Sequence, residues 1–180
     1  MASRTLLKRH IQTAWRRTIE GAYAEQLVNS ERGLQVHFCH LLLEQFKAAS
    51  LPRRIFVEPS LTDVDGRVRA PDIVICHSQK IIGVIELKYQ PRVSPSFAKD
   101  LGILKWFSES MGELTLSNTR YLGLQSTSLK KYPLSNNAVL CWAGVYRGPH
   151  VDIRAKADLP HDQFLCIHAV TSPLAAPEIC

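Results

Sequence analysis

The chain of 180 residues is long enough for one compact domain with a full hydrophobic core. Its 46% of hydrophobic and 21% of charged residues are ordinary values for a globular protein and exclude long disordered tracts. The formal net charge of +6 favours a polyanionic partner such as nucleic acid, although many proteins of this charge bind none.

The sequence lacks the features of a membrane-spanning or secreted protein. No apolar run approaches the roughly 20 residues that cross a bilayer, and the basic start has no apolar signal region. Residues 1–19 are rich in Arg and free of acids, like a mitochondrial presequence, but their helical pattern continues into the segments that follow. The five cysteines are scattered without a CxxC pair, which argues against a disulfide scaffold or a zinc ribbon. We therefore expect a cytoplasmic protein with no membrane partner.

The first third of the chain is predicted to be helical. Apolar residues recur at helical spacing over residues 4–20, and a shorter helical stretch is expected to reach Val28. Asn29-Ser30 is a typical cap for a third helix, which has Glu31 in its first turn and ends near Ser50. The inner stripe of this helix is expected to hold Leu34, Phe38, Leu41, Leu42, Gln45 and Phe46.

A meander of three strands is predicted next. The expected strands cover residues 54–61, 68–76 and 81–89, separated by turns at 63–66 and 77–80. The third strand is apolar almost throughout and is therefore predicted to lie in the centre of the sheet.

The second half of the chain predicts one more helix and more strands. The helix is expected over 96–111, and strands over 120–125, 138–146 and 164–170, the last near an edge. The tail from Ser172, with its prolines, is expected to be loose. The fold class is therefore α/β, with a mixed sheet flanked by helices.

Two carboxylates and one amine are predicted to meet on the meander. Asp72 belongs to the second strand, and Glu86 and Lys88 belong to the third. A turn centred near 78–79 places Asp72 almost opposite Glu86, and directly opposed residues of antiparallel strands lie about 5 Å apart. Alternation along the third strand puts Lys88 on the face of Glu86.

A buried pair of carboxylates needs a cation. The apolar neighbours of Glu86 indicate burial, and two buried acids are costly unless a cation neutralises them. Mg²⁺ is the natural candidate because it prefers carboxylate oxygens and water, and the backbone carbonyl of Leu87 could supply another ligand. Lys88 would then orient or deprotonate an attacking water, or stabilise the charge that develops on a phosphate.

Pro71-Asp72, thirteen intervening residues and then Glu86-Leu87-Lys88 resemble the motif of the PD-(D/E)xK nuclease superfamily. The order of predicted elements over residues 30–146 resembles the restriction-endonuclease-like core of that superfamily. Residues 1–29 would form a helical extension of a single domain 1–180, and 147–180 a C-terminal strand and tail. The resemblance implies that Asp72 and Glu86 hold metal, that Lys88 assists the water, and that Glu31 completes the metal shell from an inward-facing position.

The resemblance implies a Mg²⁺-dependent nuclease, in which Mn²⁺ could substitute, acting on phosphodiester bonds most readily in DNA. Restriction, repair, recombination and defence against mobile elements all remain open, as does RNA as the substrate. A small nuclease that cuts both strands would need to act as a homodimer. The alternative is a catalytically silent module that binds nucleic acid or another protein on the same fold.

Each site residue also has a purely structural interpretation. Glu86 and Lys88 could form an exposed pair on a solvated sheet, Asp72 could cap a turn, and Glu31 could complement the helix dipole. Gln90 could add a polar side chain near the metal. Two further sets have ambiguous roles: the candidate ligands His37, Cys39 and His40, more suited to the core and its rim, and the candidate phosphate contacts Arg53, Arg54, Arg67, Arg69, Lys99 and Lys105.

Overall fold

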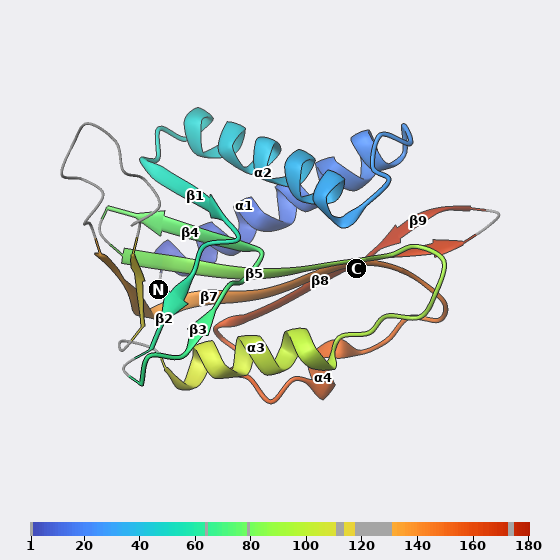
Figure 1. Ribbon diagram of the computed structural model, residues 1–180. Helices are drawn as coiled ribbons and strands as arrows, with labels where there is room; N and C mark the ends of the chain where they lie inside the picture. Colours follow the sequence, from blue (N-terminus) through green and yellow to red (C-terminus); the bar gives the residue numbers. More distant parts are fainter. Residues whose placement is uncertain (1, 64, 79, 111–113, 118–130, 173–174) are drawn as a thin grey trace.

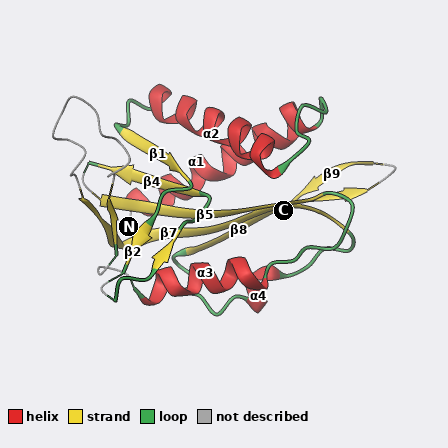
Figure 2. Ribbon diagram, viewed as in Figure 1, coloured by secondary structure: helices red, strands yellow, loops and turns green. Residues whose placement is uncertain are grey.

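A central sheet carries helices on both faces in the computed structural model (Figure 1). The structure describes residues 2–63, 65–78, 80–110, 114–117, 131–172 and 175–180. Helices α1 and α2 cover one face, and α3 and α4 cover the other (Figure 2). The mixed α/β class predicted from the sequence is therefore confirmed. Within the described part of the chain, no helix is long and apolar enough to cross a membrane.

The N-terminal helix ends earlier than the sequence suggested. Helix α1 covers Ala2–Thr18 and continues as a π-helical turn, η1, over Ile19–Tyr23. In this wider turn the Ala24 N–H donates to the Ile19 carbonyl, five residues back, at 3.1 Å. The predicted helical stretch up to Val28 is wrong, because Gln26 takes a left-handed conformation (φ 61°) that ends the helical path.

Helix α2 covers Glu31–Ala48 and begins at the predicted cap. The Ser30 hydroxyl accepts a hydrogen bond from the Gly33 N–H at 3.1 Å, which satisfies one free donor of the first turn. The buried face of the helix differs slightly from the predicted inner stripe, since Leu41 and Gln45 are only partly buried. Its buried residues are Leu34, Gln35, Phe38, Cys39, Leu42 and Phe46.

The predicted meander is present, but its first two strands are each interrupted. Strands β1 (Arg53–Val57), β4 (Ile73–His77) and β5 (Lys80–Gln90) pair antiparallel in that order. The predicted outer ends form a separate small hairpin of β2 (Leu61–Thr62) and β3 (Val68–Arg69). The predicted strand 68–76 is broken at 70–72, where Pro71 has no N–H to donate to a ladder.

The chain after β5 crosses the sheet through α3 (Ala98–Glu109) and returns as β7 (Lys131–Arg147), parallel to β5. This places β5 between β4 and β7, as its apolar sequence predicted. The start of β7 also pairs with β6 (Thr115–Ser117), which reaches β2. The predicted strand over 120–125 lies outside the described residues.

The C-terminal segment is ordered rather than loose. After α4 (Ile153–Lys156), β8 (Phe164–Ser172) runs parallel to β7, and β9 (Ala175–Ile179) pairs antiparallel with β8. The main sheet therefore has the order β1-β4-β5-β7-β8-β9. The prediction of a loose tail was wrong because Pro177 is compatible with a strand that pairs on one side only.

The two faces of the sheet bury different side chains of the same strands. Ile73 and Ile85 pack with α1 and α2, whereas Val74 and Val84 pack with α3. Because side chains alternate along a strand, this division fixes the face on which each site residue of β5 lies.

Candidate functional site

Strand β5 directs Glu86 and Lys88 to the face covered by α3. Ile85 and Leu87 belong to the core under α1 and α2, so the alternating positions lie on the opposite face. Glu86 is 5% exposed and Lys88 is partly buried. The interpretation of Glu86 as half of an exposed edge pair is therefore wrong.

Asp72 lies directly beside this part of β5. The register Ile73↔Ile85 continues to bring Asp72 next to Glu86. The Asp72 carboxylate accepts a hydrogen bond from the Leu87 N–H at 2.6 Å, and its backbone carbonyl accepts one from Gln35 Nε2 at 3.0 Å. The Asp72 side chain therefore points toward β5.

The two carboxyl groups both bind protons more tightly than usual. Burial raises the pKa of Asp72 to about 6, although the Leu87 N–H opposes the shift, and the neighbouring Glu31 carboxylate contributes to it. Burial raises the pKa of Glu86 to about 9, with a further contribution from Asp72. Burial therefore makes ionisation of both carboxyl groups less favourable than in water, most strongly for Glu86, and a nearby cation would offset this cost.

Glu86 also has an unsatisfied atom. Its Oε1 is buried and has no hydrogen-bond partner among the described residues. Such an acceptor is costly in a protein interior. An oxygen without a partner beside a second carboxylate is a donor set that suits a hard divalent cation.

Lys88 has a partner that the sequence analysis missed. Its Nζ lies 3.3 Å from Oδ2 of Asp100, which is on α3 and 4% exposed. The same oxygen accepts a hydrogen bond from Trp142 Nε1 on β7 at 3.2 Å. Burial lowers the pKa of Lys88, but the Asp100 and Glu31 carboxylates outweigh it and the net shift is upward. Lys88 is therefore held as a cation.

Glu31 reaches the site from its rim. Its side chain is exposed, so the predicted inward-facing position on the helix stripe was wrong. Its Oε2 nevertheless accepts a hydrogen bond from the Tyr89 N–H on β5 at 3.1 Å. The first turn of α2 thus brings a third carboxylate to the strand that carries Glu86 and Lys88.

Two other predicted groups, Leu87 and Gln90, form hydrogen bonds that involve backbone N–H groups. Leu87 donates its N–H to Asp72, while its carbonyl as a metal ligand stays a prediction. Gln90 accepts a hydrogen bond from the Ser96 N–H at 2.7 Å and so holds the loop that precedes α3.

Among the basic residues, Lys99 is exposed next to Asp100 and its charge acts on Glu86. Lys105 forms an ion pair with Asp158 at 2.5 Å.

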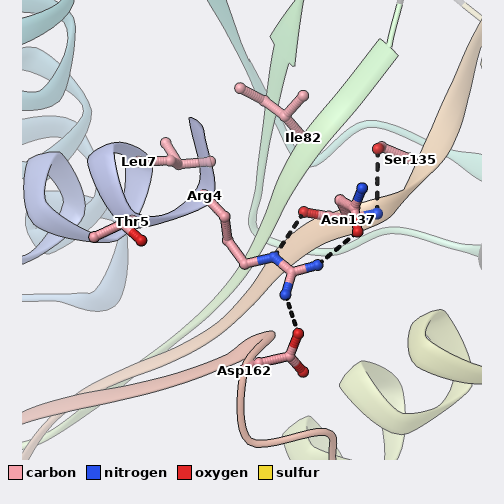
Figure 3. Close-up of a pocket in the computed structure, with 7 residues that line it drawn as sticks. All are labelled: Arg4, Thr5, Leu7, Ile82, Ser135, Asn137 and Asp162. Carbon is pink, nitrogen blue, oxygen red and sulfur yellow. Dashed lines mark hydrogen bonds and ion pairs between the residues drawn. The ribbon is translucent and has the colours of Figure 1, made fainter. Parts of the chain in front are cut away.

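A separate cavity of about 660 Å³ lies at the start of α1 (Figure 3). Arg4 crosses it, forms an ion pair with Asp162 and donates to Asn137 Oδ1 at 2.8 Å. No predicted site residue lines this cavity, and its lining is largely occupied by its own hydrogen bonds. The acid pair of Asp72, just before β4, and Glu86, on β5, is therefore the stronger candidate for chemistry.

A scan against protein-family models, a search of curated proteins and a search of solved structures each found no match to this chain.

Proposed function

We propose that the chain is a metal-dependent nuclease of the PD-(D/E)xK type, which hydrolyses phosphodiester bonds in DNA. One observation carries the proposal: Glu86 has a buried carboxyl oxygen that no described residue contacts by a hydrogen bond, beside Asp72 and on the same face as Lys88. This combination offers a cation site and a fixed positive charge at one point of the sheet.

The arrangement of elements supports the same proposal. Helix α2, the antiparallel β1-β4-β5 meander, the crossover α3 and the parallel strand β7 follow the order of a restriction-endonuclease-like core. In that core the acids stand on the second and third strands of the meander; here Asp72 directly precedes β4 and Glu86 lies on β5.

Asp72 and Glu86 would hold Mg²⁺ or Mn²⁺, with Glu31 or the Leu87 carbonyl as further ligands. The bound ion supplies polarisation of the phosphate and a lowered pKa of bound water. The protein keeps the acids close together: Leu87 fixes one oxygen of Asp72, and burial restricts Glu86. Lys99, which is exposed, would contact the backbone of the nucleic acid.

Lys88 is better suited to stabilise charge than to remove a proton. An amine that acts as a base must first lose its own proton, but the carboxylates around Lys88 raise its pKa. A protonated Lys88 can donate a hydrogen bond to the attacked phosphate as negative charge develops. Of the roles predicted from the sequence, we therefore favour charge stabilisation.

The test compares Asp72→Ala and Lys88→Ala with wild type on single-stranded, duplex and branched DNA and on RNA, with Mg²⁺ or Mn²⁺. Two matched controls remove exposed charges outside the proposed site: Asp65→Ala in the loop between β2 and β3, and Lys80→Ala at the start of β5. We expect cleavage by wild type and both controls and loss of at least 100-fold in the site variants.

Circular dichroism and thermal unfolding establish that each variant is folded. If folded wild type cleaves none of these substrates with either metal, the nuclease proposal is wrong. Binding of DNA without cleavage would instead identify a catalytically silent module on this fold. Equal cleavage by the site variants and wild type would also reject the roles proposed for Asp72 and Lys88.

A further inference from the structure

A second group of metal-ligating side chains lies in the C-terminal part of the chain. His150 follows β7, His168 is on β8, and Cys180 follows β9. One ligand atom from each of the three lies within 4.8 Å of the others. The imidazole rings of His150 and His168 have centroids 4.8 Å apart.

Backbone hydrogen bonds hold two of these residues in register. The His168 N–H donates to the Cys180 carbonyl at 3.1 Å, and the Cys180 N–H donates to the His168 carbonyl at 2.9 Å. In an antiparallel ladder, a pair joined by two such bonds presents its side chains on one face. The thiol and the imidazole are therefore neighbours because of the pairing of β8 with β9.

The loop after β7 brings the third residue to the same place. Gly148 has a positive φ of 127°, a conformation that favours glycine and turns the chain after the strand. The Val151 N–H then donates to the Tyr146 hydroxyl at 3.2 Å, which fixes the loop against β7. His150 lies between these two points, with its ring against that of His168.

His168 provides an independent sign of a missing ligand. The residue is 4% exposed, and its Nε2 is buried without a hydrogen-bond partner in the described part of the chain. Its Nδ1 faces the sulfur of Cys166 at 3.8 Å, which leaves Nε2 as the nitrogen available to a metal.

We propose that His150, His168 and Cys180 bind one zinc ion. A thiolate with two imidazoles is a typical zinc donor set, and the fourth position would be open to water or another ligand. In a tetrahedral site with zinc bonds of about 2.0–2.3 Å, ligand atoms lie about 3.3–3.8 Å apart, so the exposed side chains of His150 and Cys180 would move inward by about 1–1.5 Å to bind the ion. This site differs in chemistry from the acid pair, whose oxygen ligands suit a hard cation.

The zinc site would join three segments that are distant in the sequence. It would connect the edge hairpin of β8 and β9 to the loop after β7. Because ligand binding to the native state alone stabilises that state, zinc should raise the unfolding temperature of the whole chain.

The test uses the full chain, reduced, free of purification tags and stripped of metal with a chelator. Cobalt(II) replaces zinc as a spectroscopic probe, because a cobalt–thiolate bond gives a charge-transfer absorption that oxygen ligands do not give. We expect one equivalent of cobalt to produce this band, zinc to abolish it by competition, and Mg²⁺ to leave it unchanged.

Two variants and a control locate the bound ion. Cys180→Ser should lose the charge-transfer band, and His150→Ala should weaken cobalt binding at least tenfold. His161→Ala removes another exposed histidine, which lies before β8 and outside this cluster, and should match wild type. Absence of the band in wild type would overturn the proposal, as would its persistence in Cys180→Ser. Because the readout is sulfur ligation, it is independent of whether the chain cleaves DNA.

Discussion

Replacing Glu86 with Gln should change how the stability of the metal-free protein depends on pH. The pKa of Glu86 is raised from 4.5 to about 9 by burial, and the neighbouring Asp72 carboxylate adds to the shift. Between these values the native state keeps a proton that the unfolded chain has lost. The free energy of unfolding therefore falls as pH rises, by at most about 1.4 kcal/mol per pH unit for this one group.

The window from pH 7 to 8.5 isolates this effect, because Asp72, with a pKa of about 6, is already largely ionised there. Over these 1.5 pH units the loss reaches about 2 kcal/mol, or roughly 4–8 °C in unfolding temperature for a chain of this size. Glu86→Gln cannot ionise and should lack this component. The difference between the two proteins cancels histidines and other groups that titrate in the same range.

The assay is thermal unfolding by circular dichroism at several pH values, with and without Mg²⁺. Added Mg²⁺ should stabilise wild type most at the high end of the window, where no proton competes with the ion, and should do little for the Gln variant. If both proteins lose stability equally from pH 7 to 8.5, Glu86 does not carry the extra proton. The case for a cation site would then lose its electrostatic basis.

Two further predictions concern the groups that position Lys88. Asp100→Asn keeps an acceptor for the Trp142 N–H but removes the charge beside Lys88, so burial should lower the pKa of Lys88 relative to wild type. The alkaline limit of nuclease activity should then move to lower pH. An unchanged pH–rate profile would argue against a positioning role for Asp100. At Gly144, an added Cβ would lie 2.2 Å from the ring of the fully buried Trp142, so Gly144→Ala should cost about 1–3 kcal/mol in a denaturant titration, whereas a value near zero would show that the ring can move freely.

The part of the site that could be predicted from the sequence depends on local rules. β4 and β5 pair as the turn predicted between them requires, and alternation along β5 places Glu86 and Lys88 on one face. The pairing register then brought Asp72 to Glu86 without any knowledge of the remaining fold. The break at Pro71 left this register intact, because β4 resumes at Ile73.

The groups that were missed depend on contacts between distant elements. Asp100 is four residues before Leu104 and three after Phe97, so it lies on the apolar side of its helix, and this was the one available signal. That it meets Lys88 follows from how the crossover helix is set against β5, which no local pattern specifies. Prediction of the cluster around His168 would have required the pairing of β8 with β9, but Pro177 within β9 argues against a strand in the sequence.

The charges around Lys88 suggest that metal binding and substrate binding are coupled. Four carboxyl groups lie near the amine of Lys88, those of Glu31, Asp72, Glu86 and Asp100, although the chain as a whole has a net charge of +6. A phosphate that approaches the ionised carboxylates would be repelled, and Asp100 already holds Lys88. A divalent ion on Asp72 and Glu86 would neutralise these two acids and so reduce the negative charge that the phosphate meets. The ion would then be required for the phosphate to enter the site as well as for its hydrolysis. Loss of the acid pair should therefore weaken binding of the phosphate that is cleaved, while the contact of Lys99 with the nucleic-acid backbone persists.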